Sequence, residues 1–143
     1  MTFKITVING PNLNLLHLRD SSLYGYDGLD KIEVHLRTNF PNQEFEFFQS
    51  NIEGEIIDKI QGCIKEQSAI IINPGGYAHT SVAIKDALEL VQNPKIEVHL
   101  SNIHDREEFR KHSITATACH GVIAGLKKDG YRLAVLAIQD LAL

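Results

Sequence analysis

Short apolar runs alternate with segments of helical periodicity along the chain. The run at 69–72 is continuously apolar, which is typical of a central parallel strand covered on both faces. The segment at 29–39 instead carries apolar residues at helical spacing and stops before Pro41. The same two criteria predict the other elements. The expected strands are 3–8, 44–49, 69–72, 96–100 and 121–125, and the expected helices are 29–39, 52–66, 80–91 and 127–141.

A regular alternation of strands and helices predicts an α/β fold with a doubly wound parallel sheet. With five strands, we expect the flavodoxin-like order 2-1-3-4-5. Polar segments follow the first, third and fourth strands, at 9–24, 73–79 and 99–110. Because ligands bind beyond the carboxyl ends of the strands in such sheets, these three loops are expected to form one site. No repeat or linker interrupts the pattern, so residues 1–143 are expected to form a single domain.

Composition narrows the class of partner. The net charge of -4 and the isoelectric point of about 5.9 argue against a nucleic-acid partner, which usually requires a basic face. The two cysteines lack C-x-x-C spacing and are interpreted as buried free thiols in a reducing cytosol. The N-terminal segment has no signal-peptide pattern, and no apolar run approaches the ~20 residues that cross a bilayer. We therefore expect a soluble cytoplasmic protein with no membrane partner.

Arg19 and Tyr24 lie close together on the loop after the first expected strand. A phenol has a pKa of about 10, and a guanidinium held against the phenolic oxygen would lower that value. The pair could therefore provide a tyrosinate base. The alternative, which spacing alone favours, is a surface arginine stacked on a tyrosine ring.

His99 lies at the end of the fourth expected strand. Alternation places His99 and Glu97 on one face of this strand, and a polar pair within a central strand needs partners. One interpretation is a histidine acid whose charge or tautomer is fixed by the carboxylate. The alternative, given equal weight, is a structural histidine bonded to the backbone.

The loop after the third expected strand contains Asn73, Gly75, Gly76 and His79. Glycines let backbone amides approach a ligand closely, and amides at the start of the following helix favour a negative group. The loop lacks the Gly-Lys-Ser/Thr ending of a Walker motif, and the chain has no G-x-G-x-x-G fingerprint. For Gly76, a plain turn between strand and helix remains an alternative.

Arg106 and Arg110 are spaced so that they could share a helical face. Such a charged run is usually a solvated surface, but near the strand ends one of the two could clamp a carboxylate or a hydroxyl. The histidines are scattered and no metal-ligand spacing occurs, so no metal site is expected.

Several motifs together resemble those of the type II 3-dehydroquinate dehydratases. The matching segments are Asn9–Leu16 with Arg19 and Tyr24, Gln49–Asn51, Ile72–Tyr77, Glu97–His104 and Gly121–Gly125. They occur in order over nearly the whole chain, so the resemblance is specific. It implies a hydro-lyase (EC 4.2.1.10) that eliminates water from 3-dehydroquinate with anti stereochemistry, giving 3-dehydroshikimate through an enolate. The reaction serves the shikimate pathway of aromatic amino acid biosynthesis or quinate catabolism, and the resemblance implies neither a cofactor nor a metal.

The resemblance also assigns roles to residues and implies an assembly. Tyr24 matches the family's base, Arg19 its transition-state-stabilising arginine, His99 its acid and Asn12 the residue that orients a water. The positions that match substrate-binding residues, together with the loop glycine, are Asn73, Gly75, His79, Asp86, Leu100, Ser101 and Arg110. The family forms homododecamers built from trimers, and Asp86 would point at the site of a neighbouring subunit.

The chain departs from the usual family pattern in three places. Ile52 stands where a histidine is common, Ala78 where a threonine is common, and 17–18 reads His-Leu on the segment expected to act as a lid. None of these departures removes a proposed catalytic group. Two other functions remain alternatives: a non-catalytic protein that binds a quinate-like acid, and a flavin or nucleotide binder. The first is disfavoured by the presence of both the base and the acid, and the second by the loop at 9–14, which lacks phosphate-binding hydroxyls.

Overall fold

The computed structural model describes residues 3–142, and its elements follow the predicted alternation. The strands are β1 (Lys4–Asn9), β2 (Glu44–Gln49), β3 (Ala69–Asn73), β4 (Lys95–His99) and β5 (Gly121–Ala124). The helices are α1 (Ser21–Tyr24), α2 (Leu29–Asn39), α3 (Glu53–Glu66), α4 (Val82–Glu89) and α5 (Asp129–Leu141). Every predicted strand and helix is present, and no end is shifted by more than two residues.

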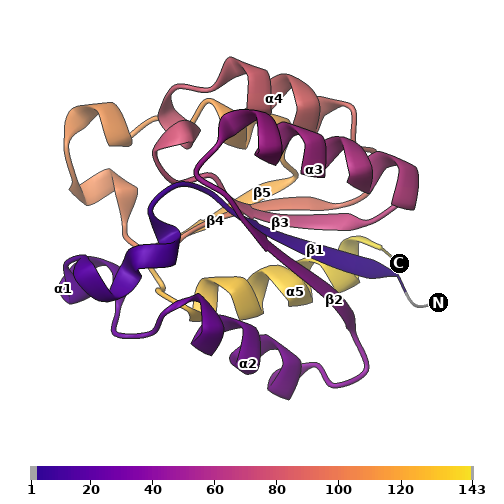
Figure 1. The fold of residues 1–143 in the computed structure, drawn as a ribbon, viewed down its shortest axis with the longest axis horizontal. Helices are drawn as coiled ribbons and strands as arrows, with labels where there is room; N and C mark the ends of the chain where they lie inside the picture. The colour runs from indigo at the N-terminus through magenta and orange to yellow at the C-terminus, as the bar shows by residue number, and fades with distance from the viewer. Residues whose placement is uncertain (1–2, 143) are drawn as a thin grey trace.

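All the strands pair in parallel in the order β2-β1-β3-β4-β5, which confirms the predicted sheet. Figure 1 shows α3 and α4 over one face of the sheet and α2 and α5 over the other. The register places Asn9 beside Asn73, at the ends of β1 and β3, and β4 ends at His99. The last residues of these three strands therefore meet at one edge of the sheet.

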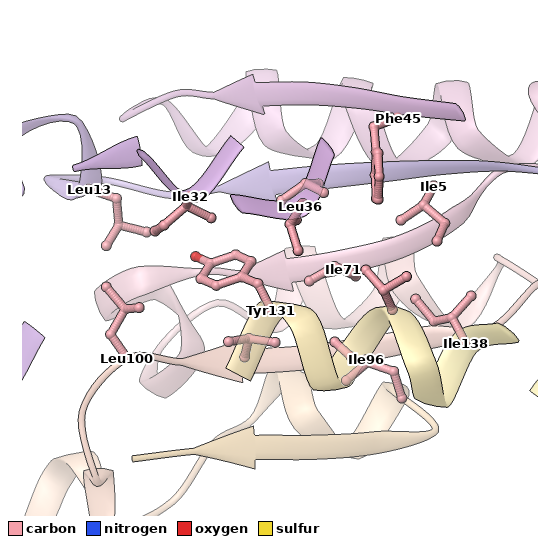
Figure 2. Close-up of a cluster of buried hydrophobic side chains, with 14 of the residues drawn as sticks. Ile5, Leu13, Ile32, Leu36, Phe45, Ile71, Ile96, Leu100, Tyr131 and Ile138 are labelled. Atoms are coloured by element: carbon pink, nitrogen blue, oxygen red, sulfur yellow. The ribbon is translucent and has the colours of Figure 1, made fainter. Parts of the chain in front are cut away.

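Burial of both faces explains why β3 is an unbroken apolar run. Ile70 and Ile72 belong to the apolar cluster beneath α3 and α4, whereas Ile71 belongs to the cluster beneath α2 and α5. Figure 2 shows the second cluster, in which Leu36 and Ile138 reach the sheet from the two helices. Each isoleucine of β3 is fully buried, and such burial contributes about 1.5–3 kcal/mol per side chain.

The loops contain short 3-10 helices that the sequence patterns did not predict. These helices are Leu13–Leu18, Gly75–His79, Ile103–Asp105, Glu108–Arg110 and Thr115–Ala118. One of them explains why α4 begins at Val82 instead of near Thr80. The Ser81 hydroxyl accepts a hydrogen bond from the backbone N–H of Ile84 at 2.9 Å, which caps α4 after the 3-10 helix has ended.

The cysteines are free thiols, as expected, but only Cys63 is fully buried. Cys119 is partly buried, which corrects the expectation that both are fully enclosed. Its immediate surroundings are nevertheless dry enough that burial raises the pKa of the Cys119 thiol to about 12. Within residues 3–142, no helix combines the length and the apolar character that crossing a membrane requires.

Candidate active site

A cavity lies at the edge of the sheet where β1, β3 and β4 end, and most of the predicted site residues line it. Those residues are Arg19, Tyr24, Asn73, Gly75, His79, His99, Leu100, Ser101 and Arg110. The wall is completed by Leu13, Gly76, Ile103 and Arg106. The cavity volume is about 30 Å³, so these side chains surround a small space.

The phenolic oxygen of Tyr24 accepts hydrogen bonds from two guanidinium groups. One comes from Arg19 on the same loop, whose guanidinium carbon also lies 3.9 Å from the centre of the Tyr24 ring. The other comes from Arg106, which donates at 2.6 Å. The Tyr24 side chain is only 8% exposed, so both cations act on an oxygen that is largely shielded from water. An oxygen with two cationic donors is well placed to carry negative charge.

The arginines also act on one another. Burial lowers the pKa of Arg19 below its usual value, and the nearby charges of Arg106 and Arg110 lower it further, while Tyr24 opposes the shift. Arg19 nevertheless remains a cation, since a guanidinium does not lose its proton in proteins. Three positive charges around one small cavity repel one another, and an anion among them reduces this repulsion. The anion can be a phenolate, a bound carboxylate or both.

His99 is held by a buried carboxylate on the same strand. Its Nε2 lies 2.7 Å from Oε2 of Glu97, which is fully buried. Glu97 also accepts hydrogen bonds from the hydroxyls of Ser113, at 2.6 Å, and of Thr115. With both of its oxygens occupied, Glu97 holds the His99 imidazole in one orientation.

The loop after β3 contributes a second imidazole and an amide. Nδ1 of His79 lies 2.8 Å from the backbone carbonyl oxygen of His112, and the His79 ring stacks on His99 with a centroid distance of 6.3 Å. The carboxamide oxygen of Asn73 accepts the backbone N–H of Gly75 at 3.1 Å. Gly75 has φ 63°, a conformation that favours glycine. The loop therefore turns so that Asn73 and His79 both face the cavity.

Leu100, Ser101 and Arg110 close the cavity on the side of β4. The Ser101 hydroxyl accepts a hydrogen bond from Arg106 at 3.3 Å. Nε of Arg110 donates to Glu107 at 2.5 Å, so Arg110 lines the cavity while it is paired on its own loop. Arg106 thus connects Tyr24 with the loop after β4.

Two predicted site residues lie outside this cavity. Asn12 is exposed, with φ 70°, and its backbone N–H donates to Asn51 Oδ1 at 3.0 Å. Asp86 is exposed on α4. Neither residue belongs to the cavity wall. The structure of the single chain therefore does not bring Asn12 and Asp86 together with the other predicted site residues.

A larger hollow of about 580 Å³ shares Tyr24 and Leu100 with the cavity. Lys127 and Lys128 line this hollow, and Lys128 is paired with Asp27 at 2.9 Å. We assign the chemistry to the smaller cavity because it joins Tyr24 to His99, the two groups that are suited to proton transfer.

Arg106 was one of two candidate clamps in the sequence, but its contact with Tyr24 was not predicted. The spacing of Arg106 and Arg110 left open which arginine acts as a clamp, and the family match favoured Arg110. Ser113 and Thr115, which hold Glu97, were not predicted either. A signal existed for Arg106 and Ser113, because both follow the motif at Glu97–His104, but no local pattern marks Thr115 as a partner of a strand residue.

The arrangement is suited to proton abstraction from a small anionic molecule. A base candidate flanked by cations and an acid candidate oriented by a carboxylate line the same cavity. Within the described part of the chain, no group of three or more potential ligand side chains is placed to hold a metal ion.

Comparison with known proteins identifies the family. The family model described as "Dehydroquinase class II" matches residues 3–139. The chain belongs to the class II dehydroquinases. This result confirms the resemblance seen in the sequence motifs. Proteins named 3-dehydroquinate dehydratase from Wolinella succinogenes and Helicobacter pylori strain P12 are 52% and 53% identical to it. Both alignments cover 96% of this chain, and they cover 84% and 86% of the respective relatives.

Solved class II dehydroquinases share the fold over almost their full length. The type II dehydroquinase of Butyrivibrio crossotus superposes with a TM-score of 0.93 at 44% identity, over 96% of this chain and 98% of that one. The type II dehydroquinase of Propionibacterium acnes has a TM-score of 0.92 at 36% identity, over 98% of each chain. A 3-dehydroquinate dehydratase-like protein from Bifidobacterium longum is more distant, with a TM-score of 0.69 at 28% identity.

Proposed function

We propose that residues 1–143 form one catalytic domain that acts as a 3-dehydroquinate dehydratase, converting 3-dehydroquinate to 3-dehydroshikimate and water. One observation carries this proposal: Tyr24, with two guanidinium donors on its oxygen, and His99, held by Glu97, line one cavity. The membership in the class II dehydroquinase family supports the same reaction.

Tyr24 acts as the base in this proposal. A proton alpha to a ketone is weakly acidic, so its removal requires both a strong base and a stabilised enolate. Arg19 and Arg106 stabilise the phenolate of Tyr24 before the reaction. The phenolate takes the proton, and the electrons of the broken C–H bond form the enolate. The negative charge thus moves from the phenolic oxygen to the substrate while the same cations remain nearby.

His99 acts as the acid. The enolate expels the hydroxyl group, whose C–O bond electrons leave with the oxygen, and an imidazolium proton from His99 completes a water molecule. Glu97 stabilises the charged imidazolium and keeps its ring in place. Because Tyr24 ends α1 and His99 ends β4, the two groups come from separate elements and can act on opposite faces of the substrate ring, as anti elimination requires.

The remaining lining residues bind the substrate. Arg110 and the segment Leu100–Ser101 meet the substrate carboxylate, while Asn73, Gly75 and His79 meet its ring hydroxyls. Asn12 orients a water beside the enolate. The residues present provide a complete acid and base for the elimination, so the proposed mechanism uses no cofactor.

The proposed enzyme is a homododecamer of trimers that works in the cytoplasm, in aromatic amino acid biosynthesis or in quinate catabolism. Exposed Asp86 then completes the site of a neighbouring subunit. Two large apolar side chains on or beside α4 support a subunit contact there, because Val82 is 56% exposed and Leu90 59% exposed.

Ultraviolet absorbance tests the reaction, because dehydration conjugates the new double bond with the ketone and the carboxylate. Adding 3-dehydroquinate to the protein should produce a rising enone band. Tyr24→Phe should slow the rise by about 10²- to 10⁴-fold, the usual contribution of a general base. Tyr26→Phe is the matched control, since Tyr26 lies on the same loop but is 91% exposed. A Tyr24→Phe variant with full rate would exclude the base assignment, and ligand binding without any band would indicate a non-catalytic binding protein.

A further inference from the structure

Three buried polar side chains form a connected chain of hydrogen bonds beside the cavity. The Tyr131 hydroxyl, on α5, donates to Oδ1 of Asn9 at 2.5 Å. The same hydroxyl oxygen accepts a hydrogen bond from Nδ2 of Asn73 at 3.2 Å. Tyr131 is fully buried, while Asn9 and Asn73 are 4% and 3% exposed. Of the three, only Asn73 lines the cavity.

The direction of every hydrogen bond in this chain follows from one backbone group. The N–H of Gly75 can only donate, so it fixes the carboxamide of Asn73 with its oxygen toward Gly75. The amide nitrogen of Asn73 must then face Tyr131. Because the Tyr131 oxygen accepts this hydrogen bond, its own proton is directed to the acceptor on Asn9.

Burial keeps that proton in place. Tyr131 lies entirely in the apolar cluster beneath α2 and α5, and this burial raises the pKa of its hydroxyl well above the usual range. Figure 2 shows the Tyr131 ring over the sheet, with its oxygen directed toward the ends of the strands. A phenylalanine would fill the same space, so packing alone does not account for a hydroxyl with two partners.

We propose that Tyr131 is a positioning residue that fixes the carboxamide of Asn73 as a hydrogen-bond donor toward the substrate. The carboxamide has two N–H groups, of which Tyr131 takes one and the cavity receives the other. The site therefore selects an oxygen that accepts a hydrogen bond at this position, such as a ring hydroxyl or a carboxylate. This inference rests on the proposed function, because Asn73 is a substrate-binding residue only if the cavity is the active site.

Tyr131→Phe is the first test, because it removes one oxygen and leaves the ring. Without the hydroxyl, the Asn73 amide group loses the partner of one of its N–H groups, and only the Gly75 N–H still holds the carboxamide in the orientation that donates toward the substrate. The KM for 3-dehydroquinate should rise about 3- to 10-fold, as expected when one neutral hydrogen bond is lost, while kcat stays within about twofold. Asn9→Ala is the second test and keeps the hydroxyl. It leaves the Tyr131 proton without its acceptor, so the KM should rise in the same way.

A double-mutant cycle separates positioning from a general loss of structure. If Tyr131 acts through Asn73, Tyr131→Phe should not raise the KM further in an Asn73→Ala background. The inference is overturned if the KM rises by the same factor in both backgrounds, or if Tyr131→Phe and Asn9→Ala both keep the wild-type KM. Failure of the proposed function looks different, because the wild-type protein itself would then produce no enone band.

Discussion

The phenolic oxygen of Tyr24 has one cationic partner from its own loop and one from a distant loop. Arg19 supplies the first and Arg106 the second, across 82 positions of sequence. A hydrogen bond to a charged group contributes about 1.5–3 kcal/mol, which is more than a neutral one. At the scale of single residues, Arg106 is thus expected to contribute to catalysis although it is neither the base nor the acid.

We expect Arg106→Gln to lower kcat by about 10- to 100-fold, the effect of losing one charge-assisted hydrogen bond on the phenolate. The enone absorbance assay measures this change directly. Arg37→Gln is the matched control, because Arg37 is exposed on α2 and pairs with Glu33. An Arg106→Gln variant with a kcat near that of the Arg37→Gln variant would contradict the role of Arg106.

The sequence could predict a contact between site residues only where the two residues lie close together in the chain. Tyr24 and Arg19 share one loop, and Glu97 and His99 alternate on one strand, so sequence spacing predicted that each pair would be close. The contact from Arg106 to Tyr24 joins two loops, and no periodic pattern encodes such a pairing. Tyr131 lies in the predicted helix 127–141 and is fully buried, but its hydroxyl pairs with residues on β1 and β3.

At the scale of elements, the predicted strands and helices were correct because their hydrophobic periodicity is strong. The loops were less predictable. A 3-10 turn such as Gly75–His79 is too short to show a period, so its extent had to come from the structure. The start of α4 followed from its Ser81 cap, which competes with several other polar residues in the same segment.

The loop after β1 approaches the loop after β3 so closely that Gly10 has no room for a side chain. A Cβ atom on Gly10 would overlap the backbone carbonyl group of Pro74. Gly10→Ala should therefore lower both the free energy of unfolding, by about 1–3 kcal/mol as for other overpacked sites, and the turnover rate. Gly62→Ala, on α3 and away from the cavity, is the control, since a Cβ there meets no atom within 4 Å. Urea unfolding and the absorbance assay should show a clear difference between the two variants.

Glu46 joins three elements through ion pairs. It accepts from Lys4 on β1 at 3.0 Å and from Lys59 on α3. Hydrogen bonds from Lys59 and Lys4 lower the pKa of the Glu46 carboxyl below its usual value. A carboxyl whose pKa is lower in the folded state stabilises the protein above its unfolded pKa, and this stabilisation is lost as the pH falls through the folded value.

We therefore expect Glu46→Gln to lower the free energy of unfolding by up to about 1 kcal/mol near neutral pH, because the pair is partly exposed. The difference from the wild-type protein should shrink as the pH is lowered below about 4. Urea unfolding at several pH values measures it. Glu44→Gln, an exposed position on the same strand, should show little difference at any pH. A Glu46→Gln effect that stayed constant with pH would contradict the ion-pair explanation.

At the scale of the whole molecule, variants of Asp86 can distinguish an active site built by one chain from an active site shared by two chains. If Asp86 serves a neighbouring subunit, then Asp86→Ala and Tyr24→Phe damage the same composite site from two different chains. Mixed oligomers of these two inactive variants should contain some sites in which both residues are intact, and activity should partly return. The assembly should sediment near twelve times the 16.0 kDa chain mass. Activity of a mixture no higher than that of its parents would argue against a shared site.

The cavity that joins Tyr24 to His99 measures about 30 Å³, which is small for a ring with a carboxylate and several hydroxyls. We propose that the segment from Asn12 to Tyr24, which supplies Leu13, Arg19 and Tyr24 to the cavity wall, acts as a gate that moves outward to admit the ring. Leu18, which is 73% exposed, lies on the outer side of that gate. The rate of gate opening and the rate of the chemical step can then change separately. Substitutions at His17 or Leu18 would alter the rate of opening without altering any group that transfers a proton.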